Sequence, residues 1–82
     1  MLTEYIDEAL KRAHYEIIED EEPFYGEVPE LKGVWASGKS LEECRSHLKD
    51  VVEGWLLISI KHNKTIPELG TAKIQEIEPI LS

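Results

Sequence analysis

One long amphipathic segment in the second half of the chain constrains the fold more than any other feature. Residues 40–43 (SLEE) have the form of a capping box, in which Ser40 caps the helix and Glu43 reaches back to the Ser40 N–H. Apolar residues then recur at helical spacing: Leu41, Cys44, Leu48, Val51, Val52, Trp55, Leu56 and either Ile58 or Ser59. Leu57 and Ile60 widen this stripe. A helix that is apolar more than halfway round needs two covers, its own sheet and a second surface.

Three short strands joined by tight turns are predicted before this helix. The strands are 14–19, 24–28 and 34–37. They are rich in aromatic and β-branched residues and are separated by proline- and glycine-containing turns, which predicts an antiparallel meander. Gly26 indicates a bulge or a close backbone approach in the second strand. Phe24 and Tyr25 must point to opposite faces of that strand, so we expect one in the core and the other available to a partner.

The two ends of the chain complete the predicted fold. Apolar residues at helical spacing predict a helix at 2–13 with Thr3 as its N-cap. Residues 72–77 are the candidate final strand, which should return parallel to a strand of the same sheet because the long helix is then a crossover. The prediction is one α+β domain, 1–82, in two layers: an antiparallel three-stranded meander, the crossover helix, the parallel final strand and an extra N-terminal helix.

Negative charge is concentrated in one short stretch. The chain has a net charge of -8, and residues 16–30 (EIIEDEEPFYGEVPE) contain seven acids and no base. A net charge of this sign argues against autonomous nucleic-acid binding, which needs Lys and Arg to replace phosphate counterions. It favours a basic partner, whose approach such a field accelerates. The alternative is that the acids only keep the protein soluble.

The order of several local motifs resembles the HicB-like antitoxin domain. These motifs are aromatic-Tyr-Gly at 24–26, Pro29-Glu30-Leu31 with Gly33, Gly38 before the capping box, Trp55-Leu56 near the helix end, and Pro67. They extend from about Tyr15 to Pro67, within a family core at about 15–77. The resemblance implies a partial ribonuclease-H-like fold to which the helix at 2–13 is an addition.

The resemblance also implies a function and a partner. It implies an antitoxin that binds and neutralises a small basic RNA-cleaving toxin of the HicA type by covering its RNA-binding surface. Many members carry a C-terminal DNA-binding module, for which we expect no room after the last strand, so this is a short form. Homo-oligomers, as dimers or tetramers, are implied too. We expect self-association through the wide helical stripe and the helix at 2–13.

The residues predicted to contact the partner belong to the acidic hairpin and its neighbouring aromatics. They are Glu19, Asp20, Glu21, Glu22, Tyr25, Glu27 and Trp35. Trp55 is expected in the core, whereas tryptophan at the surface favours protein interfaces. The alternative to the antitoxin is a stand-alone homo-oligomeric binding or regulatory module with no toxin partner.

Catalysis, cofactors and metals are not expected. A ribonuclease-H-like nuclease needs carboxylates that converge on paired metals from separated elements, whereas these acids cluster in one hairpin or lie on the polar side of the helix. Cys44 and His47 lie one turn apart but would supply only two of about four zinc ligands. A single cysteine, no signal peptide and no apolar run long enough to span a membrane indicate a cytoplasmic protein.

Overall fold

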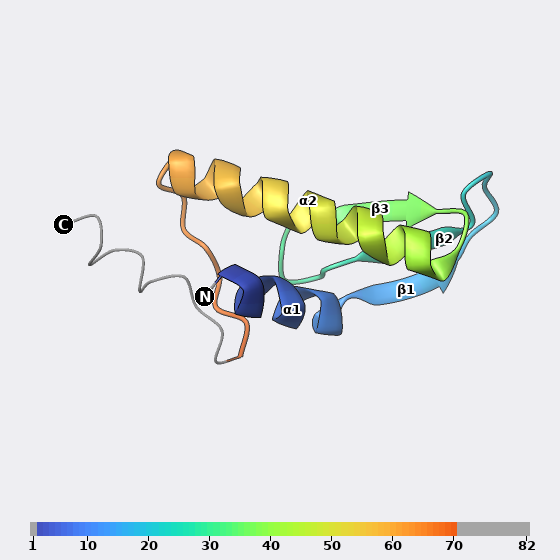
Figure 1. The fold of residues 1–82 in the computed structure, drawn as a ribbon, viewed down its shortest axis with the longest axis horizontal. Coiled ribbons are helices and arrows are strands. Elements are labelled where there is room, and N and C mark those ends of the chain that lie inside the picture. Colours follow the sequence, from blue (N-terminus) through green and yellow to red (C-terminus); the bar gives the residue numbers. More distant parts are fainter. Residues whose placement is uncertain (1, 71–82) are drawn as a thin grey trace.

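The computed structural model describes residues 2–70 and has two helices and three strands in that range (Figure 1). The elements in chain order are α1 (Leu2–Arg12), β1 (His14–Ile17), β2 (Phe24–Glu27), β3 (Trp35–Gly38) and α2 (Leu41–Lys61). The strands form an antiparallel sheet in the order β1-β2-β3. The α+β fold, the antiparallel meander and the additional N-terminal helix are therefore confirmed.

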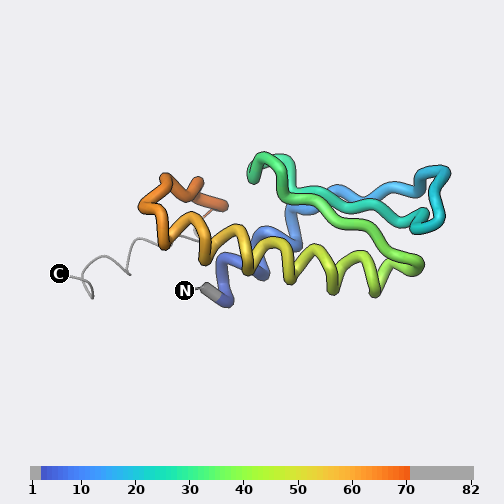
Figure 2. Tube along the Cα trace, turned by 90° about the horizontal axis from the view of Figure 1, so that it is seen from above, coloured from blue at the N-terminus to red at the C-terminus, as the bar shows by residue number. Residues whose placement is uncertain are grey.

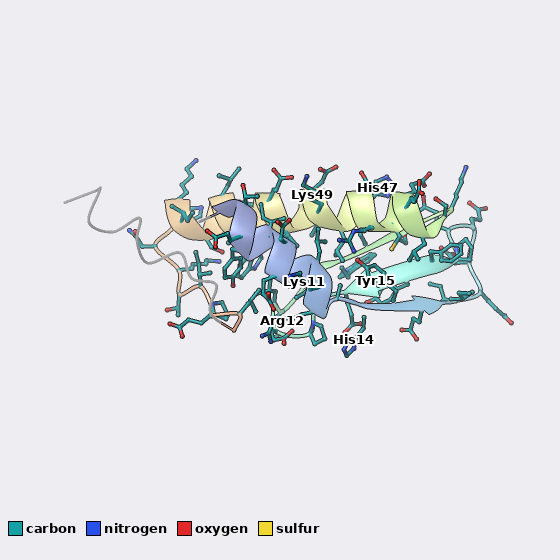
Figure 3. The ribbon with its side chains drawn as sticks, turned by 60° about the horizontal axis from the view of Figure 1, so that its bottom comes forward. Lys11, Arg12, His14, Tyr15, His47 and Lys49 are labelled. Carbon is teal, nitrogen blue, oxygen red and sulfur yellow. The ribbon has the colours of Figure 1, made fainter. Side chains whose placement is uncertain are left out.

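The register of the sheet divides its side chains into two faces. Tyr15, Gly26 and Ala36 lie in one row across the three strands, and side chains alternate along each strand. The face toward α2 carries Tyr15, Ile17, Phe24, Gly26, Ala36 and Gly38. The opposite face, which we call the outer face, carries His14, Glu16, Tyr25, Glu27, Trp35 and Ser37. Figure 3 agrees, since Tyr15 points toward α2 while His14 points away from it.

Helix α2 is longer than the sheet that it covers. Its 21 residues span about 31 Å at 1.5 Å per residue, whereas each strand of four residues spans about 13 Å. The helix contacts β3 and β2 with its N-terminal half, and Figures 1 and 2 show its C-terminal half reaching past the strands. This second half packs on α1, which extends the supporting layer beyond the sheet.

Two glycines allow α2 to approach the sheet. A Cβ on Gly38 would lie 2.5 Å from the backbone nitrogen of Cys44, so only glycine fits where β3 meets the first turns of α2. A Cβ on Gly26 would lie 2.7 Å from the ring of Tyr15, which covers it. The predicted alternative of a bulge at Gly26 is wrong, since the pairing is continuous there. The close backbone approach is confirmed.

The core is built by both helices, the inner face of the sheet and two loops. Its fully buried side chains include Tyr5, Leu31, Leu48, Leu56, Leu69, Val28, Val52 and Cys44. On α2 the buried stripe ends in Ser59, while Ile58 is 56% exposed, which resolves the choice between these two positions. Trp55 packs against the core as expected.

Helix α1 is held in place by contacts that are distant in the sequence. The Tyr5 hydroxyl donates to the carbonyl of Pro67. Arg12 pairs with Glu8 at 2.9 Å and with Glu30, in the β2–β3 loop, at 3.0 Å. The apolar side of α1, with Tyr5, Ile6, Ala9 and Leu10, is buried within the chain. It is therefore not available for the self-association expected of the helix at 2–13.

One of the two hydrogen bonds predicted for the capping box of α2 is confirmed, and the other has a different donor. Ser40 caps the helix, since its hydroxyl accepts from the Glu43 N–H at 3.1 Å. The Glu43 carboxylate, however, accepts from the N–H of Lys39 at 3.1 Å instead of Ser40. In both cases an N–H group that the helix cannot satisfy gains a partner.

Several predicted boundaries differ from the structure by one or two residues. The first strand ends at Ile17, because Ile18 already begins the hairpin loop, where its N–H bonds to the Pro23 carbonyl. Helix α1 begins at Leu2, so Thr3 lies inside its first turn and the prediction of Thr3 as N-cap is wrong. The predicted final strand at 72–77 lies outside the described residues. Within residues 2–70, neither helix is long and apolar enough to cross a membrane.

Leu48→Ala should destabilise the fold by about 2–5 kcal/mol, because it leaves a cavity at a position that is 0% exposed. Leu41→Ala is the matched control, seven residues earlier on the same helix and 50% exposed, with an expected change within about 0.5 kcal/mol. Urea unfolding of both variants measures the difference. Equal losses would contradict the placement of the core.

Tyr5→Phe should lower the free energy of unfolding by about 0.5–1.5 kcal/mol at neutral pH, because it removes the hydrogen bond to Pro67. Burial raises the pKa of Tyr5 to about 12 from 10.0, and the charge of Glu30 adds to the rise. The folded state therefore holds the phenol proton more tightly than the unfolded state does. This contribution is complete below pH 10 and is lost as the pH rises toward about 12. Unfolding free energies measured across that range should fall less steeply in Tyr5→Phe than in the wild type.

Candidate functional site

The outer face of the sheet combines carboxylates with aromatic rings and has no helix over it in the described structure. The register places Glu16, Tyr25 and Ser37 in one row and His14, Glu27 and Trp35 in the next. Because α2 covers the other face of the sheet, these side chains are open to solvent in part or in full. Trp35 is 54% exposed, which is unusual for so large an apolar side chain.

A stacked aromatic pair forms the centre of this face. The rings of Tyr25 and Trp35, on neighbouring strands, have centroids 5.9 Å apart and planes 27° from parallel. The Tyr25 hydroxyl donates to Glu27 at 3.1 Å, which orients the carboxylate beside the rings. Partial burial raises the pKa of Tyr25, and the hydrogen bond to Glu27 and the charges of Glu27 and Glu16 raise it further. The pair is thus a rigid apolar platform edged with negative charge.

A depression of about 140 Å³ adjoins the platform. The aromatic pair and Glu27 line one side, and Pro29 and Lys32 of the β2–β3 loop line the other. One hydrogen bond of 3.1 Å, from the Val28 N–H to the Val34 carbonyl, closes this loop. The depression therefore has a mixed lining, with aromatic rings, one carboxylate and one lysine.

The acidic loop, residues 19–22, lies at the end of the hairpin that β1 and β2 form. The Ile18–Pro23 hydrogen bond of 2.8 Å closes this loop, and all four of its residues are acids. Glu19, Asp20 and Glu21 are exposed. Glu22 is half-buried, because it accepts a hydrogen bond of 2.7 Å from the Ser37 hydroxyl on the outer face. The loop is therefore attached to the outer face through this bond.

The structure divides the predicted contact residues into two groups that adjoin each other. Tyr25, Glu27 and Trp35 lie together on the outer face, and Glu19–Glu22 form the acidic loop beside it. Phe24 faces α2, so the expectation of opposite faces for Phe24 and Tyr25 is confirmed, but Phe24 is half-buried and does not belong to the core. Sequence reasoning missed Glu16 and Ser37 as members of the face. Strict alternation within the strands indicates both, once the register with Tyr25 is known.

Metal binding has no support in the described part of the chain. Residues 2–70 contain no group of three or more His, Cys, Asp or Glu side chains that could hold a metal ion. Burial between α2 and the sheet raises the pKa of the Cys44 thiol, so the thiol stays protonated at neutral pH. Its sulfur lies 3.6 Å from the Ala36 carbonyl oxygen, and His47 Nδ1 lies 2.8 Å from the Ser37 carbonyl oxygen. Both side chains therefore support β3.

Comparison with known proteins identifies the family. The model of the UPF0150-like family matches residues 4–67. The chain belongs to the UPF0150-like family. This family is related to the HicB-like antitoxins, which confirms the general resemblance found in the sequence. The match includes most of α1, whereas sequence analysis placed the family core at about 15–77.

A solved structure is similar over most of the UPF0150-like chain. The crystal structure of TTHA0281 from Thermus thermophilus has a sequence identity of 53% and a TM-score of 0.85. The similarity covers 89% of this chain and 90% of that one. No curated protein matches this chain.

Glu27→Gln should lower the pKa of Tyr25 toward its ordinary value, because it removes a negative charge and the acceptor for the phenol proton becomes neutral. Titration of ring-labelled tyrosine by NMR measures this pKa directly. Glu53→Gln, on the exposed side of α2, is the control and should leave it unchanged. An unchanged Tyr25 pKa in Glu27→Gln would contradict the described pairing.

Proposed function

We propose that this chain is an antitoxin-like protein that binds and neutralises a small basic RNA-cleaving toxin of the HicA type by covering its RNA-binding surface. The observation that carries the proposal is the outer face, where stacked aromatic rings adjoin carboxylates and the acidic loop. Membership of a family related to HicB-like antitoxins supports the toxin as partner.

The chemistry of RNA binding explains why such a face suits such a toxin. A protein that binds RNA presents Lys and Arg side chains to phosphates, and its affinity comes largely from those contacts. Carboxylates at the same positions compete with the phosphates for these cations. Because Glu16, Glu22 and Glu27 lie beside the aromatic pair, they are placed to pair with cations while the rings exclude water around them.

The two groups of residues have different expected roles. The exposed acids of the loop act at long range and increase the rate of encounter with a basic partner. Trp35 and Tyr25 supply a rigid apolar contact area, which sets the lifetime of the complex. The proposal has no catalytic step and uses no cofactor.

Self-association belongs to the same proposal. We propose a dimer or tetramer, with the outer face of each copy left open for its toxin. The exposed apolar side chains of Leu57 and Ile58 on α2 support this oligomer.

The decisive experiment uses the reading frame next to this one. If a short, strongly basic protein is encoded there, its expression alone should arrest growth, and co-expression of this chain should restore it. The two proteins should also co-purify. A toxic neighbour that is neither bound nor neutralised by this chain would rule out the antitoxin.

Neutralising Glu19, Asp20 and Glu21 with Gln, Asn and Gln should slow association with the toxin by about tenfold at low salt. At about 1 M salt, where the screening length is about 3 Å, the variant and the wild type should associate equally fast. Stopped-flow measurements at several salt concentrations test this. The matched control neutralises Asp7, Glu42 and Glu53, which are exposed on the helices. Equal effects of the two triple variants would mean that only net charge matters.

Trp35→Ala should raise the dissociation rate by about tenfold or more while the association rate changes little. The side chain is 54% exposed, so its loss should leave the fold intact, which circular dichroism checks. Leu41→Ala removes a side chain of similar exposure elsewhere and serves as the control. An unchanged lifetime in Trp35→Ala would place the contact on another face.

A further inference from the structure

Gly54 is the one feature of α2 that packing within the described chain does not explain. It lies in the middle of a 21-residue helix, where glycine is less favourable than alanine. A Cβ built on Gly54 meets no atom within 4 Å, in contrast to the close contacts at Gly26 and Gly38. Residues 2–70 therefore contain no neighbour that requires the absence of a side chain at this position.

Two large apolar side chains are exposed beside Gly54. Leu57 and Ile58 follow it by three and four residues, so both lie one helical turn away, and they are 62% and 56% exposed. Val51, three residues before Gly54, is half-buried. Gly54 thus leaves a shallow notch in the surface of α2, beside Leu57 and Ile58 and next to the exposed Asp50, on the side of the helix that faces away from the sheet. Exposed apolar clusters of this kind mark interaction surfaces.

We propose that this notch binds a second copy of the same chain, with the two α2 helices packed antiparallel and crossing at Gly54. The proposal rests on the homo-oligomer of the proposed function and assigns its interface. A two-fold axis through the crossing places Gly54 against Gly54 and Val51 of one copy near Leu57 of the other. Without side chains at the crossing point, the two helices approach more closely than larger residues allow.

The distribution of charge favours a second copy in this antiparallel arrangement. The acidic loop lies at one end of the molecule, whereas Gly54 lies in the half of α2 that reaches past the sheet (Figure 1). Antiparallel helices therefore send the two acidic loops in opposite directions, which keeps the strongest like charges apart. The arrangement also brings Asp50 of one copy within a turn of Lys61 of the other. A basic partner, in contrast, is attracted to the outer face on the other layer of the fold.

The first test measures the mass of the full chain by analytical ultracentrifugation. The wild type should be a dimer, or a tetramer built from such dimers. Gly54→Leu fills the notch and should weaken this association at least about tenfold, giving monomers, or dimers from a tetramer. Lys49→Leu adds the same side chain at an exposed position outside the notch and should leave the mass unchanged. Circular dichroism at low concentration verifies that each variant is folded.

The second test asks whether position 54 of one copy lies close to position 54 of the other. Gly54→Cys should form a disulfide-linked dimer on mild oxidation, because two cysteines at the crossing lie within the short Cα–Cα range that a disulfide needs. Cys44 is 0% exposed, so the native thiol does not interfere. Lys49→Cys is the control and should remain monomeric on a non-reducing gel.

The outcomes separate this interface from the wider proposal. A wild-type oligomer that Gly54→Leu does not weaken, or that Gly54→Cys does not cross-link, would overturn the interface and leave the oligomer standing. A monomeric wild type would overturn both. Neutralisation of the toxin is measured by growth rescue and co-purification. Neither the overturned interface nor a monomeric wild type would decide whether this chain is an antitoxin.

Discussion

The packing of α2 is the interaction on which the rest of this small fold depends. Its buried stripe, from Cys44 to Ser59, is longer than three four-residue strands can cover. Helix α1 and the loop that contains Leu69 supply the missing support. Gly38 and Gly26 set how closely the helix lies on the sheet, since a side chain at either would collide with Cys44 or Tyr15. An 82-residue chain buries only a small hydrophobic core, so a two-layer fold of this size depends on the support that the sheet, α1 and the Leu69 loop together give to α2.

Covering one face of the sheet with α2 leaves the other face open to solvent. The same register that turns Tyr15 and Ala36 inward turns Tyr25 and Trp35 outward. The outer face is an ordered surface, because its rings stack, Tyr25 holds the Glu27 carboxylate, and Ser37 holds the carboxylate of Glu22 in the acidic loop. A surface with this degree of order loses little conformational entropy on binding.

The acidic loop, the aromatic platform and the apolar notch occupy different parts of the molecule. The acidic loop lies at the hairpin end, the aromatic platform lies on the outer face, and the apolar notch lies on the opposite side of α2. In the proposed function, this separation lets one chain attract a basic partner, hold it and associate with its own copies without competition among these tasks. In the proposed dimer, the two acidic loops lie away from the interface, whereas Asp50 lies near it, within a turn of Lys61 of the other copy.

Within residues 2–70, the sequence alone determined the elements and their order. Helical spacing predicted both helices, and the capping Ser40 marked the start of α2 correctly, because these signals come from residues within one turn of each other. Alternation and turn residues likewise predicted the antiparallel meander, and the motif order predicted the family. Six of the seven residues predicted to contact the partner lie in one hairpin, so the sequence alone was enough to group them. Trp35 joins them only through the pairing of β2 with β3.

Contacts between distant residues decided the rest. Whether Ile58 or Ser59 is buried depends on where α1 supports the end of α2, and this support joins residues more than forty positions apart. The same applies to the apolar side of α1, which is buried in the core rather than free, and to the bond between Ser37 and Glu22. Gly54 looked like any helical glycine in the sequence, and only the empty space around its absent side chain distinguishes it. Local periodicity specifies which side of an element is apolar, but only the packed chain specifies what covers that side.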